Sequence, residues 1–461
     1  MDELKKVKMR TQSPETRAKN FKEVELGYSR EEALKEASRC LHCKLPKCVE
    51  GCPVKIRIPD FIQAVKEENI KKAYKIISES SSLPAICGRV CPQEKQCEGQ
   101  CIRGIKGEAI SIGYLERYVA DQAMELGIRA KKPRARKGKK IAIVGSGPSG
   151  LTCAGDLAKA GFDVDIYEVL HKAGGVLTYG IPEFRLPKAV VDKQVEDLRK
   201  LGVRILTSIP VGNQITIDEL RKEYDAVYLA TGAGLPKFMG IEGENADNVF
   251  SANEVLTRIN LMKAYEKNSK TPIKKGNIAY VIGGGNVAMD AVRSLKRLGI
   301  EAHIMYRRGE DELPARKMEV MHAKEEGIIF NLLKNPTKIL TDENNNVIGM
   351  EVVDMELTEP GEDGRRNVVP KKGSEHTVKC DIVVMALGTG PNHLALQDSN
   401  IVLTDRNLIA VKGTKTSMRH VYAGGDAVTG AATVILAMEA GKQAAAEIMD
   451  TLERLEKFKM D

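Results

Sequence analysis

From residue 140 to the end of the chain, short apolar runs alternate with longer stretches whose apolar residues recur at helical spacing. The short runs are typical of strands that are buried on both faces. Strands that alternate with helices in this way predict an α/β fold made of βαβ units. The predicted strands cover residues 141–144, 162–168, 225–230, 278–282, 302–306, 381–387 and 421–423, and the clearest predicted helices cover residues 151–161 and 431–449.

The first of these strands runs directly into a glycine-rich turn, Gly145-x-Gly147-x-x-Gly150. Gly145 permits the tight turn, Gly147 lets the backbone approach a pyrophosphate, and Gly150 allows close packing of helix on strand. The N-terminus of the next helix would face the phosphates. Glu168 ends the following strand, 18 residues after Gly150, where an acid can bind ribose hydroxyls. In this context the motif predicts a dinucleotide-binding module, although the glycine pattern alone would be weak evidence.

A second copy of the module begins at residue 278, and it is the only internal repeat that we find. Gly283 and Gly285 occupy the first two glycine positions, and Ala288 replaces the third. Asn286, at the start of the next helical stretch, joins the candidate cofactor-binding residues. The repeat therefore predicts two nucleotide modules in one chain.

The strand after this second turn ends in Arg307 and Arg308 instead of an acid. A guanidinium at this position can bind a 2′-phosphate, which a carboxylate would repel. The second module is therefore predicted to bind NADP(H) rather than NAD(H). The alternative is that both arginines are ordinary surface charges at a strand end.

Two further segments bear on the cofactor of the first module. Residues 225–232 form an apolar strand that ends in Ala-Thr-Gly, and residues 421–426 form one that ends in Gly424-Gly425-Asp426. Asp426 can accept hydrogen bonds from a polyol, and the helix start near Thr433 offers free backbone N–H groups to a flavin edge. The alternative role of Asp426 is that of a helix N-cap, for which aspartate is a favoured residue.

The region between the last two predicted strands has a different pattern. Residues 335–357, with Asn344, Asn345 and Asn346 at the apex, predict a β-hairpin. Residues 359–374 are polar and contain glycine and proline, so they predict a loop.

Eight of the ten cysteines lie between residues 40 and 101, in the pattern CxxCxxxxCxxxCP followed by two CxxxC pairs. Close spacing supplies several thiolates on tight loops, as cuboidal iron–sulfur clusters require, and the Cys-Pro endings are those of bacterial ferredoxin runs. Eight thiols suffice for two four-iron clusters. Zinc sites and disulfides are the alternatives, but only Cys40 and Cys43 form the short hook that zinc modules repeat.

Composition excludes several other classes of protein. Of the 461 residues, 42% are hydrophobic and 29% are charged, as in globular proteins. No signal-peptide core or run of 18 apolar residues is present, so we expect a cytoplasmic protein without a membrane span. The net charge is +8, and residues 131–140 contain seven Lys or Arg. We interpret this run as a solvated linker rather than a nucleic-acid patch, because no aromatic residues alternate with the charges.

The glycine loop, Glu168, and the Ala-Thr-Gly and Gly-Gly-Asp strand ends together resemble the flavoprotein reductases that carry FAD in one module and a pyridine nucleotide in the other. With the cysteine region in front, nearly the whole chain resembles the small (β) subunit family of NADPH-dependent glutamate synthase. Related families are the large subunit of NADH-dependent reduced ferredoxin:NADP oxidoreductase, sulfide dehydrogenase, and the N-terminal part of dihydropyrimidine dehydrogenase. The resemblance rests on CxxCxxxxCxxxCP, CGRVCP, AGGVLTYGIPEFRLPK, which includes Gly175 as a candidate FAD-binding residue, and YAGGDAVTGAATVILAMEAGKQAA.

The resemblance also implies how the cysteines divide between two [4Fe–4S] clusters. One cluster would be held by Cys40, Cys43, Cys48 and Cys101, and the other by Cys52, Cys91, Cys97 and Glu116. Glu116 stands in a segment where relatives place a Gln or Glu ligand, and Cys87 would then be a buried spectator. Counting thiols alone favours Cys87 as the eighth ligand, and Glu116 would otherwise be an ordinary surface carboxylate.

The expected architecture is α/β, with two Rossmann-like dinucleotide-binding domains, for FAD and NADP, preceded by a helical iron–sulfur domain. We expect the iron–sulfur domain at residues 1–138 and the NADP domain at residues 251–389. The FAD domain would consist of residues 139–250 and 390–461. The two remaining cysteines, Cys153 and Cys380, form no Cys-x-x-Cys pair, which argues against a dithiol mechanism, and we expect both in the core.

The function implied is transfer of a hydride from NADPH to FAD, and of single electrons through the clusters to a partner. The partner would be a glutamate synthase large subunit or a small flavin/iron–sulfur subunit such as ferredoxin. Asp2, not a cysteine, follows Met1, so no N-terminal amidotransferase nucleophile is present. A second catalytic barrel would need about 250 further residues. The alternatives are the NADP-reducing subunit of a bifurcating ferredoxin-dependent NADH:NADP oxidoreductase, a sulfide dehydrogenase, or a redox-inactive scaffold.

Overall fold

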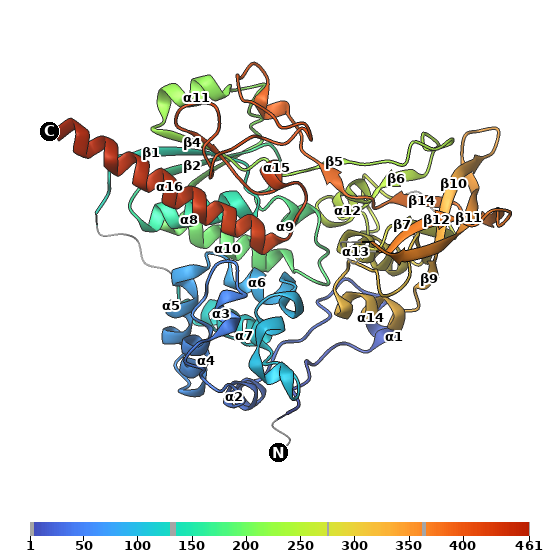
Figure 1. The fold of residues 1–461 in the computed structure, drawn as a ribbon, viewed down its shortest axis with the longest axis horizontal. Helices are drawn as coiled ribbons and strands as arrows, with labels where there is room; N and C mark the ends of the chain where they lie inside the picture. The colour runs from blue at the N-terminus through green and yellow to red at the C-terminus, as the bar shows by residue number, and fades with distance from the viewer. Residues whose placement is uncertain (1–3, 130–134, 274–275, 362–365, 461) are drawn as a thin grey trace.

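The computed structural model describes residues 4–129, 135–273, 276–361 and 366–460. Figure 1 shows a helical lobe in blue, a sheet region above it that combines green and red segments, and a second sheet region in yellow and orange at its side. We call these the cysteine-rich lobe, the first module and the second module. Together they confirm the predicted fold class of two α/β nucleotide modules preceded by a helical region.

The cysteine-rich lobe consists of short helices joined by the loops that carry the cysteines. Its elements are α1 Pro14–Arg17, α2 Arg30–Ser38, α3 Lys47–Glu50, α4 Ile58–Lys66, α5 Ile70–Ser80, α6 Pro84–Val90 and α7 Ile112–Glu125, with the 3-10 helices η1 Gln93–Lys95, η2 Glu98–Gln100 and η3 Ile102–Ile105. Helix α4 buries Ile58, Phe61, Ile62 and Val65. These positions follow the i, i+3, i+4, i+7 spacing of one apolar stripe, and this stripe fixes α4 on the core of the lobe.

The first module is a five-stranded parallel sheet in the order β3-β2-β1-β4-β16. Its elements are β1 Lys140–Val144, α8 Pro148–Lys159, β2 Asp163–Glu168, α9 Val176–Tyr179, α10 Lys188–Leu201, β3 Arg204–Thr207, α11 Ile217–Glu223, β4 Ala226–Leu229, η4 Leu394–Leu396, β16 Val421–Ala423, α15 Asp426–Thr429 and α16 Val434–Met460. The chain leaves this sheet after β4 and returns for β16. Two distant segments therefore build one sheet.

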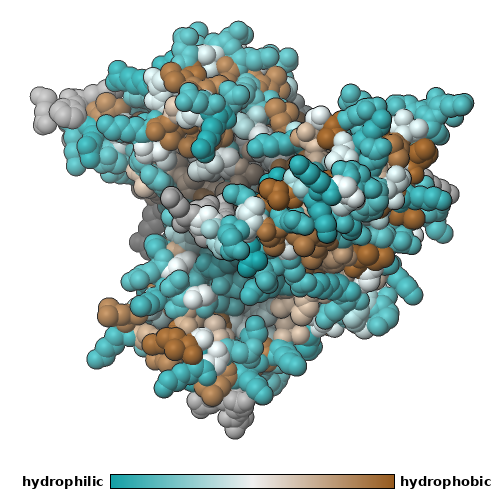
Figure 2. All heavy atoms as spheres, turned by 45° about the vertical axis from the view of Figure 1, so that its right-hand side comes forward, coloured by the Kyte–Doolittle hydropathy of each residue, from teal (hydrophilic) through white to brown (hydrophobic). Residues whose placement is uncertain are grey.

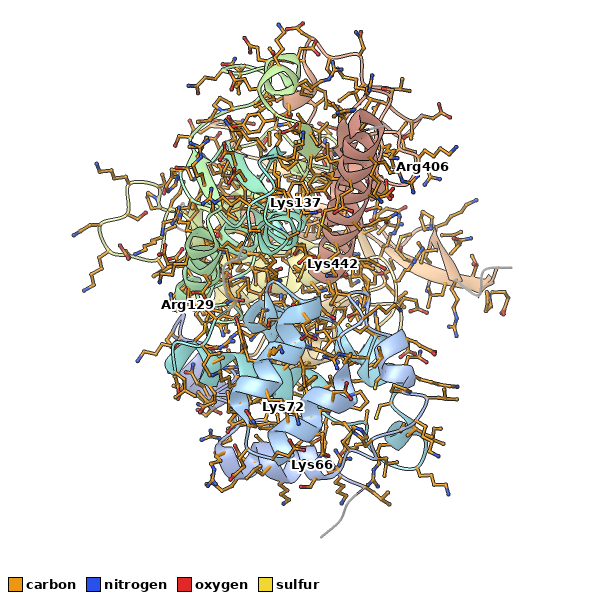
Figure 3. The ribbon with its side chains drawn as sticks, turned by 90° about the vertical axis from the view of Figure 1, so that its left-hand side faces the viewer. Lys66, Lys72, Arg129, Lys137, Arg406 and Lys442 are labelled. Atoms are coloured by element: carbon orange, nitrogen blue, oxygen red, sulfur yellow. The ribbon has the colours of Figure 1, made fainter. Side chains whose placement is uncertain are left out.

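Helices α8 and α16 cross at short distance on this sheet. A Cβ atom on Gly441 would collide with the backbone of Ser149, so only glycine allows this approach. Lys442 of α16 donates a hydrogen bond to Asp156 of α8 over 2.8 Å, and Figure 3 shows Lys442 above the helices that carry Lys66 and Lys72. The close crossing places the N-terminus of α16 beside the glycine turn that follows β1.

The second module repeats the same strand order, β9-β8-β7-β14-β6, and all its strands are parallel. Its elements are β6 Val249–Ser251, α12 Ala252–Asn260, β7 Ile278–Ile282, α13 Asn286–Arg297, β8 Glu301–Tyr306, α14 Lys317–Glu325, β9 Ile329–Leu332 and β14 Ile382–Met385. This topology confirms the predicted internal repeat. The boundary expected between residues 250 and 251 falls inside β6, and the domain limits stay a proposal.

A small antiparallel sheet connects β9 to β14. It consists of β10 Lys334–Thr341, β11 Val347–Pro360, β12 Arg366–Pro370 and β13 His376–Lys379. The hairpin predicted at residues 335–357 is confirmed, because β10 pairs with β11 and the three asparagines form the turn. The carboxylate of Asp342 accepts the backbone N–H groups of Asn344 and Asn346, and this hydrogen-bonded turn sets the hairpin register.

The loop predicted at residues 359–374 is wrong in part, because residues 366–370 form β12 against the end of β11. Most side chains of β12 are exposed. Backbone hydrogen bonds to β11 hold the strand, and no apolar face shows in its sequence. Residues 362–365 of the predicted loop lie outside the described residues. A two-stranded ribbon of β5 Leu235–Pro236 and β15 Thr389–Gly390 joins the two modules.

The N-terminal segment of the cysteine-rich lobe, which includes α1, extends from the other helices of the lobe and packs on the second module. Arg17 of α1 is buried and forms ion pairs with Glu325 and Glu326 at the end of α14. Phe21 stacks on Tyr265, with 4.4 Å between ring centroids. Figure 1 shows that α1 lies beside α14, although the two helices are far apart in the sequence. These contacts fix the second module relative to the lobe.

Part of the basic run at residues 131–140 lies outside the described residues. In the described part, Arg136, Lys137 and Lys139 form ion pairs with acidic residues of the first module. This agrees with its interpretation as a linker. Among the described residues, no helix has the length and apolar character needed to span a membrane.

Candidate functional site

The glycine turn after β1 has the geometry of a dinucleotide-binding loop. Gly145 adopts φ +103°, and a Cβ atom there would collide with the carbonyl of Ala230. A Cβ on Gly150 would collide with the carbonyl of Gly145, so helix α8 packs directly on the turn. Gly147 differs, because a Cβ on it would meet nothing within 4 Å. The space in front of Gly147 is where the fold family places the pyrophosphate.

Glu168 lies at the end of β2 and contacts this turn. It is buried, and its carboxylate accepts hydrogen bonds from the backbone N–H of Ser146, over 3.0 Å, and from the Ser146 hydroxyl. The Ser146 hydroxyl in turn accepts the backbone N–H of Gly174. Ser146 could not be predicted as a site residue, since a serine between two glycines carries no distinctive signal in the sequence. Glu168 is in place for a ribose, but that contact stays a prediction.

Two more predicted residues converge on the same turn. Gly175 adopts φ +54°, and a Cβ on it would lie 2.9 Å from the Cα of Gly147. Gly425 adopts φ +67°, and a Cβ on it would lie 3.1 Å from the Cβ of Ser149. Both glycines thus let other segments approach the turn. Residues far apart in the chain therefore surround one open space next to Gly147.

Asp426 follows Gly425 at the start of α15. Its carboxylate accepts only the backbone N–H of Ala432, over 3.2 Å, among the described residues. Burial raises the pKa of Asp426 to about 6, because this single hydrogen bond compensates only part of the lost hydration. The N-cap of α15 is Gly425, so Asp426 is not the cap of its helix. A half-buried carboxylate with spare acceptor positions suits a polyol.

Thr433 directly precedes α16, and its hydroxyl accepts the backbone N–H of Leu436 over 3.4 Å. It therefore caps a helix of 27 residues, whose first-turn N–H groups carry the positive end of the helix dipole. This N-terminus lies beside the space next to Gly147, because a Cβ atom placed on Gly425 would lie 3.8 Å from the Ala437 side chain and 3.1 Å from that of Ser149. The N-terminus of a helix can stabilise negative charge on the ring of a bound cofactor.

The turn after β7 repeats this geometry in the second module. Gly283 adopts φ +142°, and a Cβ on it would collide with the carbonyl of Ala386. A Cβ on Gly285 would meet nothing within 4 Å, as at Gly147. Ala288, in the third glycine position, is fully buried. The second module thus leaves the same open space for a pyrophosphate.

Arg307 and Arg308 follow β8, at the same edge of the sheet as this turn. Arg307 is exposed, whereas Arg308 is half-buried. The Nε atom of Arg308 is buried and has no hydrogen-bond partner among the described residues. A buried cationic donor without a partner is costly, so this orphaned N–H fits an anionic ligand. It distinguishes Arg308 from an ordinary surface charge.

Asn286 begins α13, and its Oδ1 atom accepts the backbone N–H of Arg316 over 2.9 Å. The Arg316 guanidinium donates to Gln93 Oε1 over 2.9 Å and to the carbonyl of Arg89 over 3.3 Å. The nucleotide turn is thereby connected to the loop that carries Cys91. Arg316 and Gln93 could not be predicted from the sequence, because each lies far along the chain from its partner.

The eight clustered cysteines fall into two groups in the cysteine-rich lobe. In the first group, burial raises the pKa of Cys48 to about 12, and the neighbouring thiols of Cys101, Cys40 and Cys43 contribute in the same direction. Cys40 has Cys101 and Cys43 as its own electrostatic neighbours. All four are partly exposed. The structure therefore brings together the four residues that the resemblance assigns to one cluster.

In the second group, burial raises the pKa of Cys52 to about 11, and Glu116 and Cys87 contribute further. Cys97 has Cys52 and Glu116 as electrostatic neighbours. Cys91 belongs to the same group, because Glu116 and Cys97 are among its electrostatic neighbours. Cys52 and Cys91 are buried, whereas the first group lies closer to the surface.

Glu116 is buried on α7, and its Oε1 atom has no hydrogen-bond partner among the described residues. Burial raises the pKa of this carboxyl well above its usual value, and the nearby Cys87 thiol adds to the shift. A buried carboxylate that faces thiols is unfavourable unless a cation binds it. The orphaned oxygen therefore fits an iron ligand, and the alternative of a surface carboxylate is wrong.

Cys87 is fully buried on α6, between the second group and the first module. Its Sγ atom lies 3.4 Å from the sulfur of Met438 on α16 and 3.8 Å from the Ser81 hydroxyl. Hydrogen bonding to Cys87 raises the pKa of Cys91. The structure thus leaves both Cys87 and Glu116 within reach of the second group. It also brings this group against the helix that begins beside the first nucleotide turn.

Nowhere in the described part of the chain do three or more His, Cys, Asp or Glu side chains converge on the position of a single metal ion. The four ligands of a cubane cluster bind four different irons, so they lie farther apart than the ligands of one ion. Cys153 and Cys380 are both buried, as expected for core residues.

Two family descriptions match the chain. The family described as pyridine nucleotide-disulphide oxidoreductase matches residues 139–444. The family described as dihydropyrimidine dehydrogenase domain II, 4Fe-4S cluster, matches residues 17–128. The first match covers both nucleotide modules, and the second covers the cysteine-rich lobe. FAD, NADP and [4Fe–4S] clusters are accordingly the cofactors of this oxidoreductase.

Solved structures support the fold of the two modules. FprA from Mycobacterium tuberculosis in complex with NADPH superposes with a TM-score of 0.60 at 20% identity, over 70% of this chain and 86% of the other. Thioredoxin reductase from T. acidophilum superposes with a TM-score of 0.51 at 21% identity, over 68% of this chain and 99% of the other. At these identities the likeness shows the fold alone.

Relatives with similar sequences match nearly the whole length of the chain. The NADPH glutamate synthase small chain of Escherichia coli K12 is 36% identical over 94% of each chain, and that of Azospirillum brasilense is 34% identical over 93% of this chain and 91% of its own. The NADPH-Fe(3+) oxidoreductase subunit beta of Geobacter sulfurreducens is 35% identical over 88% of this chain, but only 63% of its own length is covered. The chain therefore belongs to the family of the glutamate synthase small chains.

Proposed function

We propose that the chain is the electron-input subunit of a larger NADPH-dependent oxidoreductase of the glutamate synthase type. The observation that carries the proposal is the match to the Escherichia coli small chain over 94% of both chains. When bound, FAD takes a hydride from NADPH, and the clusters carry the electrons onward one at a time. No side chain needs to act as a nucleophile.

Within this proposal the first module orients FAD. The open space at Gly147 would accommodate the pyrophosphate, Asp426 would accept hydrogen bonds from the polyol, and the N-terminus of α16 would face the flavin ring. The full set of proposed FAD-binding residues is Gly145, Gly147, Gly150, Glu168, Gly175, Gly425, Asp426 and Thr433.

The second module would hold NADPH in the same manner. The pyrophosphate would lie at Gly285, and the orphaned Nε atom of Arg308 would donate to the 2′-phosphate. The full set of proposed NADPH-binding residues is Gly283, Gly285, Asn286, Arg307 and Arg308.

We further propose two clusters in the cysteine-rich lobe, in a chain with its thiols reduced, as in the cytoplasm. The grouping of the thiols supports one ligand set of Cys40, Cys43, Cys48 and Cys101. It supports a second set of Cys52, Cys91, Cys97 and Glu116. The contact between Cys87 and Met438 supports a position of the second set next to the first module. Electrons would then pass from the first module to the second set, and from there to the first set.

The proposal is tested with the purified, cofactor-replete chain. NADPH should reduce ferricyanide or a viologen dye. With glutamine, 2-oxoglutarate and NADPH supplied, no glutamate should form until a partner subunit is added. Glutamate made by the isolated chain would contradict the subunit assignment. Failure of the FAD-loaded protein to reduce any dye would contradict the enzymatic assignment.

Relatives that are subunits of other enzymes support a second candidate function. NADP(+)-dependent formate dehydrogenase subunit beta of Moorella thermoacetica is 37% identical over 87% of this chain. The same electron-input subunit could therefore serve a ferredoxin-dependent NADH:NADP oxidoreductase, a sulfide dehydrogenase or another multi-subunit enzyme. Reconstitution with a glutamate synthase large subunit, or with a small flavin/iron–sulfur subunit, decides which partner restores turnover.

The eighth cluster ligand can be identified by comparing Glu116→Ala with Cys87→Ser. We expect about eight iron and eight sulfide per chain in the native protein and in Cys87→Ser, as two four-iron clusters require. Glu116→Ala should perturb one cluster, because it removes the orphaned carboxylate that faces the second group. Iron and sulfide analysis of anaerobically purified protein is the measurement. Loss of a cluster only in Cys87→Ser would reverse the assignment.

Nucleotide preference is tested with the double variant Arg307→Ala/Arg308→Ala. Losing charge-assisted hydrogen bonds to the 2′-phosphate should cost about 1.5–3 kcal/mol, or roughly ten- to a hundredfold in NADPH affinity. FAD content should stay unchanged. Steady-state kinetics with NADPH and NADH provide the measurement, and Arg308→Ala alone should account for most of the loss because Arg307 is exposed. Unchanged selectivity would contradict the proposed role of both residues.

A further inference from the structure

Large apolar side chains are exposed on the cysteine-rich lobe beside the first group of cysteines. Leu41 and Leu45 are 55% and 85% exposed, and Ile102 and Ile105 are 53% and 77% exposed. Leu41 and Leu45 lie in the loop between Cys40 and Cys48, and Ile102 directly follows Cys101. Figure 2 shows hydrophobic residues gathered on the surface of this lobe. We call these four residues the apolar patch.

The two halves of the apolar patch belong to one surface. The Arg103 side chain donates to the carbonyl of Arg39 over 2.9 Å, and Cys101 is an electrostatic neighbour of both Cys40 and Cys48. The loop after Cys40 and the turn after Cys101 are therefore adjacent. An apolar cluster at the surface of a protein costs solvation free energy, and such patches mark sites of association.

The charges around the patch are mostly positive. Lys44, Lys47 and Lys106 are exposed, and no ion pair is found for them in the described part of the chain. Lys66, at the margin, donates to the carbonyl of Cys40. Glu50 and Glu108 are the exposed acids nearby, and Glu108 already accepts the backbone N–H of Lys6. An apolar centre with an excess of lysines at its rim is complementary to an acidic partner surface.

The position of the patch relative to the two cysteine groups indicates where electrons would leave the protein. Cys52 and Cys91 of the second group are buried and Cys97 is partly exposed, and Cys87 beside this group contacts Met438 of the first module. The first group is partly exposed and lies under the patch. Electrons that enter at the second group would therefore reach the surface at the first group, where the apolar patch is.

We propose that the apolar patch and its lysines are the docking surface for a redox partner whose electron-accepting centre lies beneath an apolar face with an acidic rim. This inference rests on the proposed function, because it assumes that electrons leave through the clusters. Each NADPH would supply two electrons and release one proton, and two one-electron acceptors would be reduced in succession. Redox encounters of this kind use small surfaces and depend on electrostatic steering.

The test uses two protein acceptors of opposite charge, an acidic plastocyanin and a basic cytochrome c, with NADPH as donor and the holoprotein as catalyst. At low salt the wild type should reduce plastocyanin about tenfold faster than cytochrome c, because the lysines steer the acidic protein. Raising the salt to about 0.5 M should abolish this advantage by screening. Equal rates with both acceptors, or reduction of neither, would overturn the docking proposal if ferricyanide is still reduced.

Two double variants separate the apolar from the electrostatic contribution to docking of the acceptor. Leu45→Ser/Ile105→Ser and Lys44→Glu/Lys47→Glu should each lower the plastocyanin rate about tenfold at low salt. Both should retain their iron content and their ferricyanide rate. The matched control is Ile348→Ser/Val369→Ser, which alters exposed apolar residues on the antiparallel sheet of the second module and should change nothing.

Lys44 and Lys47 are next to cluster ligands, so Lys106→Glu repeats the charge test at a position farther from them. It should lower the plastocyanin rate in the same direction with full iron content. An unchanged plastocyanin rate in all three patch variants, or an equal loss in the control, would overturn the proposal. Loss of ferricyanide reduction in the wild type would instead reject the proposed function.

Discussion

Replacing Gly147 with valine should give a folded protein that no longer retains FAD or oxidises NADPH with any acceptor. Gly147 is the N-cap of α8 at φ −68° and ψ −179°, an extended conformation that valine also adopts. No protein atom lies within 4 Å of the added Cβ. The new side chain would therefore leave the fold intact and occupy the proposed place of the pyrophosphate. We expect at least a hundredfold loss of FAD affinity, or about 2.8 kcal/mol.

The chain offers a matched variant, Gly285→Val, at the equivalent position of the second module. Gly285 is the N-cap of α13 at φ −86° and ψ 177°, and a Cβ there also meets nothing within 4 Å. This variant should retain FAD and its visible spectrum but lose the reaction with NADPH. Measuring flavin content, thermal unfolding and dye reduction for both variants separates the two cofactor sites. FAD loss in Gly285→Val with retention in Gly147→Val would contradict the order of the modules.

Replacing Glu326 with alanine should destabilise the protein by about 3–5 kcal/mol, because the change leaves the buried Arg297 guanidinium without a counter-charge. It also removes one of the two acidic partners of Arg17 and of Arg293. Glu326 is buried at the end of α14. It pairs with Arg293 and Arg297 of α13 over 2.8 Å and 2.7 Å, and with Arg17 of the N-terminal segment over 3.1 Å. Chemical denaturation gives the free energy of unfolding. As a control, Arg454→Ala removes an exposed pair with Asp450 and should cost at most about 1 kcal/mol.

The same buried pairs predict a dependence of stability on pH. Burial alone would raise the pKa of Glu326, but Arg293 and Arg297 hold it at about 2, below its usual value near 4.5. A depressed pKa in the folded state stabilises the fold fully above the usual value, and this stabilisation is lost as the pH falls from about 4.5 to about 2. Unfolding measured across this range should show a smaller loss in Glu326→Gln than in the native protein. Equal acid sensitivity of both would contradict this contribution.

Several features could be predicted because their causes are local in the chain. The turns at Gly145 and Gly283 need positive φ and leave no room for a side chain, so glycine marks them in the sequence. The two strand–turn–helix patterns and the hairpin at Asn344–Asn346 follow from spacing and turn chemistry alone. Strand β12 was missed because its side chains are exposed and only backbone hydrogen bonds to β11 define it.

What the sequence determined by itself is the set of cofactor-binding motifs, because each glycine turn, strand end and cysteine loop is defined by neighbours along the chain. Only the tertiary structure decided which of these motifs meet. It brought Gly175 and Gly425 to the turn at Gly147, and the orphaned oxygen of Glu116 to the second group of cysteines. The ion pairs of Arg17 and the links of Arg316 join residues hundreds of positions apart. Such contacts depend on how the packed elements fold back on one another, and no local pattern in the sequence encodes them.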